Sequence, residues 1–134
     1  MSEAKVWYPS GEPDSIDWAP AKQAARDAVE RDGLKAEACG IVVSGRVLLH
    51  TNVARETGRF AFSDEDSVAT YDALEAGTLD GIWHSHPLGH MDPSPHDWDG
   101  HPHGIAMYIV MLVGKSEYVT RWDDHDRRHR REGY

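Results

Sequence analysis

The sequence predicts an α/β protein in which a mixed or mostly antiparallel β-sheet is flanked by two helices. Two segments have apolar residues at helical spacing and capping residues at their ends, and several short apolar or β-branched runs are separated by turn residues. A chain of 134 residues can bury one hydrophobic core but not two. We therefore expect residues 1–134 to form a single domain with irregular tails at 1–14 and 123–134.

The composition restricts the range of partners. The chain has 23 acidic and 14 basic residues, and its net charge of −9 opposes nucleic-acid binding, because phosphate contacts rely on clustered Lys and Arg. No apolar run approaches the roughly 18 residues of a membrane span, and the first residues do not resemble a secretory signal. We expect a cytoplasmic protein that binds neither nucleic acid nor membrane. The single cysteine, Cys39, excludes an internal disulfide and a four-thiolate zinc site.

The first helix is expected between Trp18 and Arg31, where the sequence is rich in Ala. Asp17 is a suitable N-cap, Pro20 suits the first turn, and Gly33 is a natural C-terminal stop. One stripe of this helix is apolar and consists of Ala21, Ala24, Ala25, Ala28 and Val29.

Short strands are expected after this helix. Cys39–Val43 and Arg46–Val53 are β-branched runs separated by Ser44-Gly45, which predicts a hairpin. Phe60–Phe62 is expected to form a further short strand.

A second helix is expected from the residues after Ser63. Ser63 can act as N-cap with Asp66 three residues later, and Gly77 can end the helix. The apolar residues between them are Val68, Tyr71 and Leu74.

Two apolar strands are expected in the C-terminal half. Gly81–Trp83 leads as a buried strand into His84, and Ile105–Val113 has the composition of a central strand. A turn at 114–116 then leads into Tyr118–Trp122. The long polar segment 87–104 lies between these strands, and loops of that length inside compact domains are usually functional.

The spacing of two histidines in this segment predicts a metal site. Six of the nine histidines lie between residues 84 and 103. Residues i and i+2 of a strand share one face about 6–7 Å apart, so His84 and His86 can converge on one ion at about 2.0–2.1 Å from each ring nitrogen. Pro87 ends the strand, and Asp97 lies far enough along the chain to return as a third ligand.

Such a ligand set indicates catalysis. Two histidines and one carboxylate leave a fourth position for water, as in catalytic rather than structural zinc sites. Water bound to zinc ionises near neutral pH, and a nearby base must accept its proton.

These residues resemble a known family. His84-Ser85-His86-Pro87, six intervening residues and Ser94-Pro95-His96-Asp97 resemble the signature H-x-H-P-x(6)-S-x-x-D of the JAMM metallopeptidases, also called the JAB-domain or MPN-plus family. Upstream, Glu37-Ala38-Cys39-Gly40 is similar to the family's E-x-C-G segment. The resemblance extends from about Glu37 to Trp122 and is to prokaryotic or phage members.

The resemblance implies a cytidine-deaminase-like α/β fold and a set of roles. His84, His86 and Asp97 would bind one Zn²⁺ per chain. Glu37 would serve as general base and then protonate the leaving amine. Ser94 would donate a hydrogen bond to the developing oxyanion.

The resemblance also implies an activity, the hydrolysis of a peptide or isopeptide bond in a protein or peptide substrate. Within the family such substrates include ubiquitin-like or sulfur-carrier tails, and some members take part in phage tail assembly. The alternative is a non-catalytic scaffold that keeps the JAB fold for protein–protein contacts.

Other polar residues have less defined expectations. Ser85 should face away from the metal, and Cys39 should be a small buried residue rather than a nucleophile. Only Trp98–Gly104 separate Asp97 from the next strand, so the helix that usually follows the family's aspartate should be a single turn or absent. Four further histidines could bind a second ion, line a substrate groove, orient the ligands or be solvated: His90, His96, His101 and His103.

Overall fold

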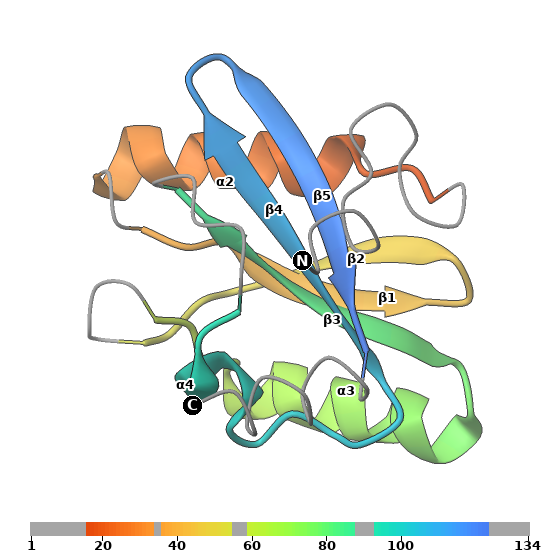
Figure 1. The fold of residues 1–134 in the computed structure, drawn as a ribbon. Helices are drawn as coiled ribbons and strands as arrows, with labels where there is room; N and C mark the ends of the chain where they lie inside the picture. The colour runs from red at the N-terminus through yellow and green to blue at the C-terminus, as the bar shows by residue number, and fades with distance from the viewer. Residues whose placement is uncertain (1–15, 34–35, 55–58, 88–92, 124–134) are drawn as a thin grey trace.

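The predicted mixed sheet is present and has five strands in the order β2-β1-β3-β4-β5 (Figure 1). The computed structural model describes residues 16–33, 36–54, 59–87 and 93–123. β3 pairs in parallel with β4, whereas β1–β2, β1–β3 and β4–β5 pair antiparallel. The strands are β1 (Cys39–Val43), β2 (Arg46–His50), β3 (Leu79–His86), β4 (Ala106–Val113) and β5 (Ser116–Trp122).

Helices cover both faces of this sheet. In Figure 1, α2 (Ala19–Asp32) lies on one side, and α3 (Asp64–Ala76) and the short α4 (Pro95–Trp98) lie on the other. α2 buries its face against a cluster that includes Val42, Trp83, Tyr108, Val110 and Val119. On the opposite face, two smaller clusters contain Ile41 and Ile82 near α3 and Met107, Ile109 and Trp122 near α4. Of the helices described, none is long and apolar enough to cross a membrane.

α2 matches the expected helix in position and in its buried stripe. Ala21, Ala25 and Ala28 are buried, and Ala24 and Val29 pack against the same cluster. Gly33 ends the helix at φ 104° and donates its N–H to the Val29 carbonyl. The expected cap is displaced by one residue: Trp18 is the N-cap without a side-chain bond, and Asp17 Oδ1 accepts the N–H of Ala19 at 3.1 Å.

The β1–β2 hairpin forms at the expected turn. Ser44 and Gly45 have φ of 49° and 78°, and positive φ at both central residues is the mark of a type I′ turn. β2 ends at His50, however, and not at Val53 as expected. The segment Phe60–Phe62 is likewise not a strand, since it makes only an isolated bridge between Asn52 and Phe62.

The side chain of Asn52 explains why pairing stops there. Its Oδ1 accepts the N–H groups of Ala54 at 2.9 Å and Ala61 at 3.1 Å. Its Nδ2 donates to the carbonyls of Glu37 at 2.9 Å and Arg59 at 3.0 Å. One amide therefore satisfies backbone groups that a regular ladder would otherwise pair.

α3 has the caps that the sequence predicts. Ser63 Oγ accepts the N–H of Asp66, and Gly77 ends the helix at φ 74° in the left-handed region. The apolar residues of α3 do not all face the sheet. Leu74 packs against the sheet, whereas Val68 and Tyr71 are 60% and 59% exposed.

β3 lies at the centre of the sheet, and β4, the expected central strand, is its neighbour. Every residue of β4 up to Leu112 is buried, in agreement with its unbroken apolar sequence. α4 is a single turn, as expected from the few residues between Asp97 and β4.

Gly40 is the point of closest packing in the β1–β3 region. A Cβ at this position would overlap the Leu48 carbonyl oxygen and lie 2.5 Å from Trp83 Nε1. That indole nitrogen donates to the same Leu48 carbonyl at 3.2 Å. The glycine of the E-x-C-G segment is therefore explained by packing.

We expect Gly40→Ala to destabilise the fold by about 3 kcal/mol, because the added methyl group overpacks backbone that cannot move aside. Gly114→Ala is a matched control: its Cβ meets no atom within 4 Å and only its φ of 60° is unfavourable, at a cost of about 1–2 kcal/mol. Urea denaturation of both variants measures the difference. Equal losses of unfolding free energy would mean that steric overlap at Gly40 is not the cause.

Candidate metal centre

The last residues of β3 supply two of the predicted ligands. His84 and His86 are two positions apart on one strand, so both rings project from the sheet face that α3 and α4 cover. β1 pairs with this strand up to His84, and β4 pairs with it up to His86. Both histidines are buried, His84 completely.

The third predicted ligand, Asp97, lies on α4. Its N–H is 3.0 Å from the Ser94 carbonyl oxygen and 3.1 Å from Ser94 Oγ. In return, Ser94 donates its own N–H to Asp97 Oδ2 at 2.9 Å. Ser94 thus holds the carboxylate in place, while its exposed hydroxyl group retains a proton that it can donate.

The three side chains meet in a compact triangle of donor atoms. His84 Nε2 is 3.1 Å from His86 Nε2 and 3.4 Å from Asp97 Oδ2, and His86 Nε2 is 3.3 Å from Asp97 Oδ2. Tetrahedral ligands at about 2.0–2.1 Å from zinc are about 3.3 Å from one another. The donor set and its spacing therefore fit a zinc ion, and this group is the candidate metal cluster among the described residues.

The protonation states also suit a metal. Burial lowers the pKa of His84, although the neighbouring Asp97 acts in the opposite direction. For Asp97, burial raises the pKa, but hydrogen bonds from His84, His86 and the Ser94 N–H together hold it well below its ordinary value. A neutral imidazole and an ionised carboxylate are the forms that bind divalent metal.

The β1–β3 register places Glu37 beside this triangle. Cys39 pairs with His84, so Glu37 lies opposite His86, and its side chain shares the face that carries the histidines. Ser85 extends the pairing, because its N–H donates to the Ala38 carbonyl at 3.0 Å and its Oγ accepts the Ala38 N–H at 2.8 Å. Ser85 thus faces away from the metal site, as the sequence predicts, and its hydrogen bonds are to the distant backbone of Ala38.

The Glu37 carboxyl group is buried, and one of its oxygens has no partner in the described part of the chain. The residue is 8% exposed, and Oε1 has no hydrogen-bond partner among the described residues. Burial raises its pKa to about 7, with His86 lowering it and Asp97 raising it further. A carboxyl group with a pKa near neutrality can both accept and return a proton.

Phe60 is a contributor to this site that the sequence did not reveal. Its ring stacks on His84 with centroids 4.5 Å apart and planes at 19°. His84 Nδ1 is buried without a hydrogen-bond partner among the described residues, although metal-binding histidines usually donate that N–H. Packing against Phe60 therefore orients this ring.

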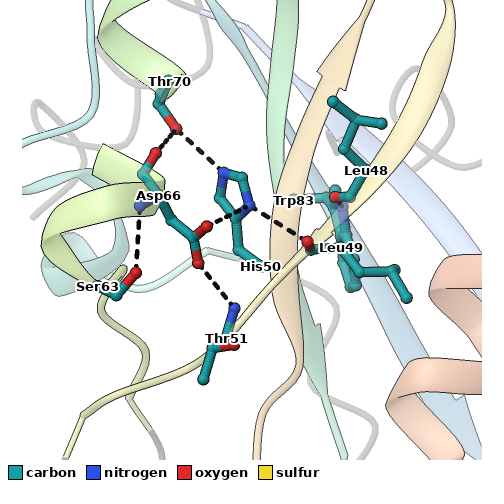
Figure 2. A network of polar contacts seen from close by, with 8 residues as sticks. All are labelled: Leu48, Leu49, His50, Thr51, Ser63, Asp66, Thr70 and Trp83. Carbon is teal, nitrogen blue, oxygen red and sulfur yellow. Dashed lines mark hydrogen bonds and ion pairs between the residues drawn. The ribbon is translucent and has the colours of Figure 1, made fainter. Parts of the chain in front are cut away.

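A polar network around His50 supports the same region from the side of α3 (Figure 2). His50 Nε2 is 3.2 Å from Thr70 Oγ1, and Nδ1 is 3.5 Å from Asp66 Oδ1. Asp66 also accepts the N–H of Thr51 at 3.0 Å, which lowers its pKa. The network attaches the end of β2 to α3 and so fixes the backbone next to Asn52.

The remaining histidines and the cysteine have different surroundings. His101 is buried, and its Nε2 is 2.7 Å from the Ile105 carbonyl oxygen, so it closes the turn after α4 and is not a solvated residue. His103 is exposed. His90 and the side chain of His96 lie outside the described part of the structure. Cys39 is buried and its pKa is raised to about 12, first by burial, which agrees with the expected structural role.

The mixed sheet and the buried triangle define the class of protein, an α/β domain with a candidate site of two histidines and one carboxylate. The chain belongs to the family described as prokaryotic homologs of the JAB domain (Prok-JAB), which matches residues 19–125. The family resemblance of the sequence is thereby confirmed. The fold is similar to the solution structure of protein DSY2949 from Desulfitobacterium hafniense, with a TM-score of 0.56 and 20% identity over 78% of this chain and 84% of that chain. No curated protein matches the chain.

The triangle leads to a stoichiometric prediction. Purified protein should bind about one zinc ion per chain, and His84→Ala or Asp97→Ala should abolish tight binding by removing one of three ligands. His103→Ala is the control, because this exposed histidine lies outside the triangle. Metal analysis and a competing chelator measure the loss. Undiminished zinc in both ligand variants would exclude this ligand set.

The raised pKa of Glu37 predicts a pH-dependent stability of the metal-free protein. The pKa rises from its ordinary value of 4.5 to about 7 on folding, so between these values the unfolded chain loses its proton first and the folded state loses stability. Metal-free Glu37→Gln should therefore match the wild type at pH 4 and exceed it by about 3 kcal/mol at pH 8. Chelator-treated samples are compared by urea denaturation. A constant difference across this range would contradict burial of an ionisable carboxyl group.

Proposed function

We propose that the protein is a zinc-dependent metallopeptidase that hydrolyses a peptide or isopeptide bond. The observation that carries this proposal is the buried Glu37 carboxyl group, whose Oε1 has no hydrogen-bond partner in the described part of the chain, next to a triangle of donors with the spacing of a tetrahedral zinc site. A structural site would have no need of this group, because burying a carboxyl group without a partner costs stability.

Each residue has a role in this proposal. His84, His86 and Asp97 would hold zinc, which when bound supplies Lewis-acid activation of water and of the substrate carbonyl. Glu37 accepts a proton from the attacking water and transfers it to the leaving nitrogen as the C–N bond breaks, so that one water is consumed and a carboxylate and an amine are formed. The Ser94 hydroxyl group donates to the carbonyl oxygen as negative charge develops there.

The substrate in this proposal is a protein or peptide, and the family resemblance favours a ubiquitin-like or sulfur-carrier tail or a phage tail-assembly protein. The net charge of −9 supports a protein partner over nucleic acid. A non-catalytic scaffold is the competing function. The retention of all three ligands together with Glu37 favours the enzyme.

The test is a comparison of Glu37→Gln with Glu75→Gln, an exposed carboxylate on α3. Glu37→Gln should keep its zinc and lose about 10²–10⁴-fold in hydrolysis, the contribution of general acid–base catalysis. Glu75→Gln should retain both its zinc and its hydrolytic activity. Mixed peptides from a proteome digest serve as substrate, and mass spectrometry identifies the products.

The outcomes separate the two functions. Zinc-loaded wild-type protein that cleaves no peptide or ubiquitin-like fusion would favour the scaffold. Near-wild-type cleavage by Glu37→Gln would place the general base elsewhere. Loss of zinc from this variant would make Glu37 a ligand.

A further inference from the structure

A cavity of about 220 Å³ opens beside the candidate metal centre. It lies between the 60–62 segment, β3, the first half of α3 and the turn after α4. Its lining residues are Phe60, Phe62, Ser67, Ile82, Asp97, Asp99, Gly100 and His101. Small-molecule sites usually occupy about 300–1,000 Å³, so this cavity is better suited to a single side chain.

The cavity touches the triangle at two points. Asp97 belongs to both, and Phe60, which lines the cavity, stacks on His84. A side chain in the cavity would therefore belong to a residue very close to the bond presented to the metal centre. This position is where selectivity for one substrate residue over another has its largest effect on cleavage.

The walls of the cavity differ in chemistry. Phe60, Phe62 and Ile82 form an apolar side, whereas the exposed Asp99, which is not one of the candidate metal ligands, contributes a carboxylate at the turn after α4. No Lys or Arg is among its lining residues, and the ring nitrogen Nε2 of His101 contacts the Ile105 carbonyl oxygen. A carboxylate side chain would meet like charge here, whereas a cation would meet opposite charge.

The protein surface around the cavity is also negatively charged. α3, which provides Ser67 to the cavity, has Asp64, Glu65 and Asp66 in its first turn and contains no Lys or Arg. The whole chain has a net charge of −9. The field of such a surface favours the approach of cationic segments.

We propose that this cavity is a specificity pocket for a lysine or arginine side chain of the substrate, next to the bond that is cut. The apolar stem of such a side chain packs against Phe62 and Ile82, and its charged end lies near Asp99 and against the aromatic rings. The proposal rests on the proposed peptidase function and adds the substrate class: a basic peptide segment.

The test measures binding and needs no turnover. Zinc-loaded, full-length Glu37→Gln is titrated with capped pentapeptides Ala-Ala-X-Ala-Ala, where X is Lys, norleucine or Glu, and amide shifts are followed by NMR. Norleucine is the matched probe, since it keeps the apolar stem and lacks the charge. The lysine peptide should shift Ser67, Asp99, Gly100 and His101 and bind about five-fold more tightly than the norleucine peptide, the effect of one exposed charge pair. The Glu peptide should bind most weakly.

Three further substitutions locate the effect. Asp99→Asn should make the lysine and norleucine peptides equal, whereas Asp72→Asn, an exposed α3 carboxylate outside the cavity, should keep the preference. Ser67→Phe places a large ring at the cavity from an exposed helix position and should weaken both peptides alike.

Three outcomes would overturn the proposal, and a fourth would separate it from the proposed peptidase function. Equal affinities of the lysine and norleucine peptides would mean that the pocket selects only for apolar contact. Unchanged affinity of the Ser67→Phe variant would mean that the peptide binds elsewhere. Absence of shifts with all three peptides would mean that the cavity holds no substrate side chain. Because binding is measured on Glu37→Gln, lysine-selective shifts without any hydrolysis by the wild type would refute the peptidase and leave the pocket standing.

Discussion

Two imidazoles and two carboxyl groups occupy one buried corner of this protein, and the rest of the structure is arranged around that constraint. Three of their atoms are within 3.1–3.4 Å of one another, and Glu37 lies beside them with Oε1 unpaired as far as the chain is described. Groups of this kind are costly to bury without a compensating charge. Only a backbone that resists rearrangement can keep them there, because any local opening would let water in and relieve the cost.

This resistance to rearrangement comes from hydrogen bonds to the backbone next to these groups, and the Asp97 carboxylate also accepts the Ser94 N–H. Asn52 and Ser85 bind the main chain at Glu37 and Ala38, and Ser94 binds the main chain at Asp97. β1 and β4 hold β3 from both sides. The Glu37 carboxylate oxygen Oε1 and His84 Nδ1 are left without partners among the described residues. The backbone bonds therefore fix the positions of Glu37 and His84 without occupying these two side-chain atoms.

Features that depend on neighbours in sequence could be predicted, and features that depend on neighbours in space could not. Strand alternation and a complete motif predicted the His84, His86 and Asp97 cluster, and capping residues predicted α3. The stack of Phe60 on His84 and the four bonds of Asn52 needed the tertiary fold, because nothing local marks either residue. Phe60–Phe62 looked like a strand because it alternates aromatic and small residues, yet Asn52 takes up the backbone groups that pairing would have used. The burial of His101 was not predicted either, although its partner, the Ile105 carbonyl, is only four residues further along the chain.

The unequal support of the three candidate ligands has a consequence for the kinetics of metal binding. His84 and His86 belong to a strand that is bonded on both sides, whereas Asp97 belongs to a four-residue helix held by Ser94 and by the buried Trp98. Segments with few backbone bonds open at a lower free energy than strands at the centre of a sheet. An incoming ion should therefore meet a preformed pair of imidazoles and be captured when the carboxylate closes, and a departing ion should lose the carboxylate first. The residence time of the ion would then be set by one helical turn, and a change at Ser94 would alter exchange without altering the sheet.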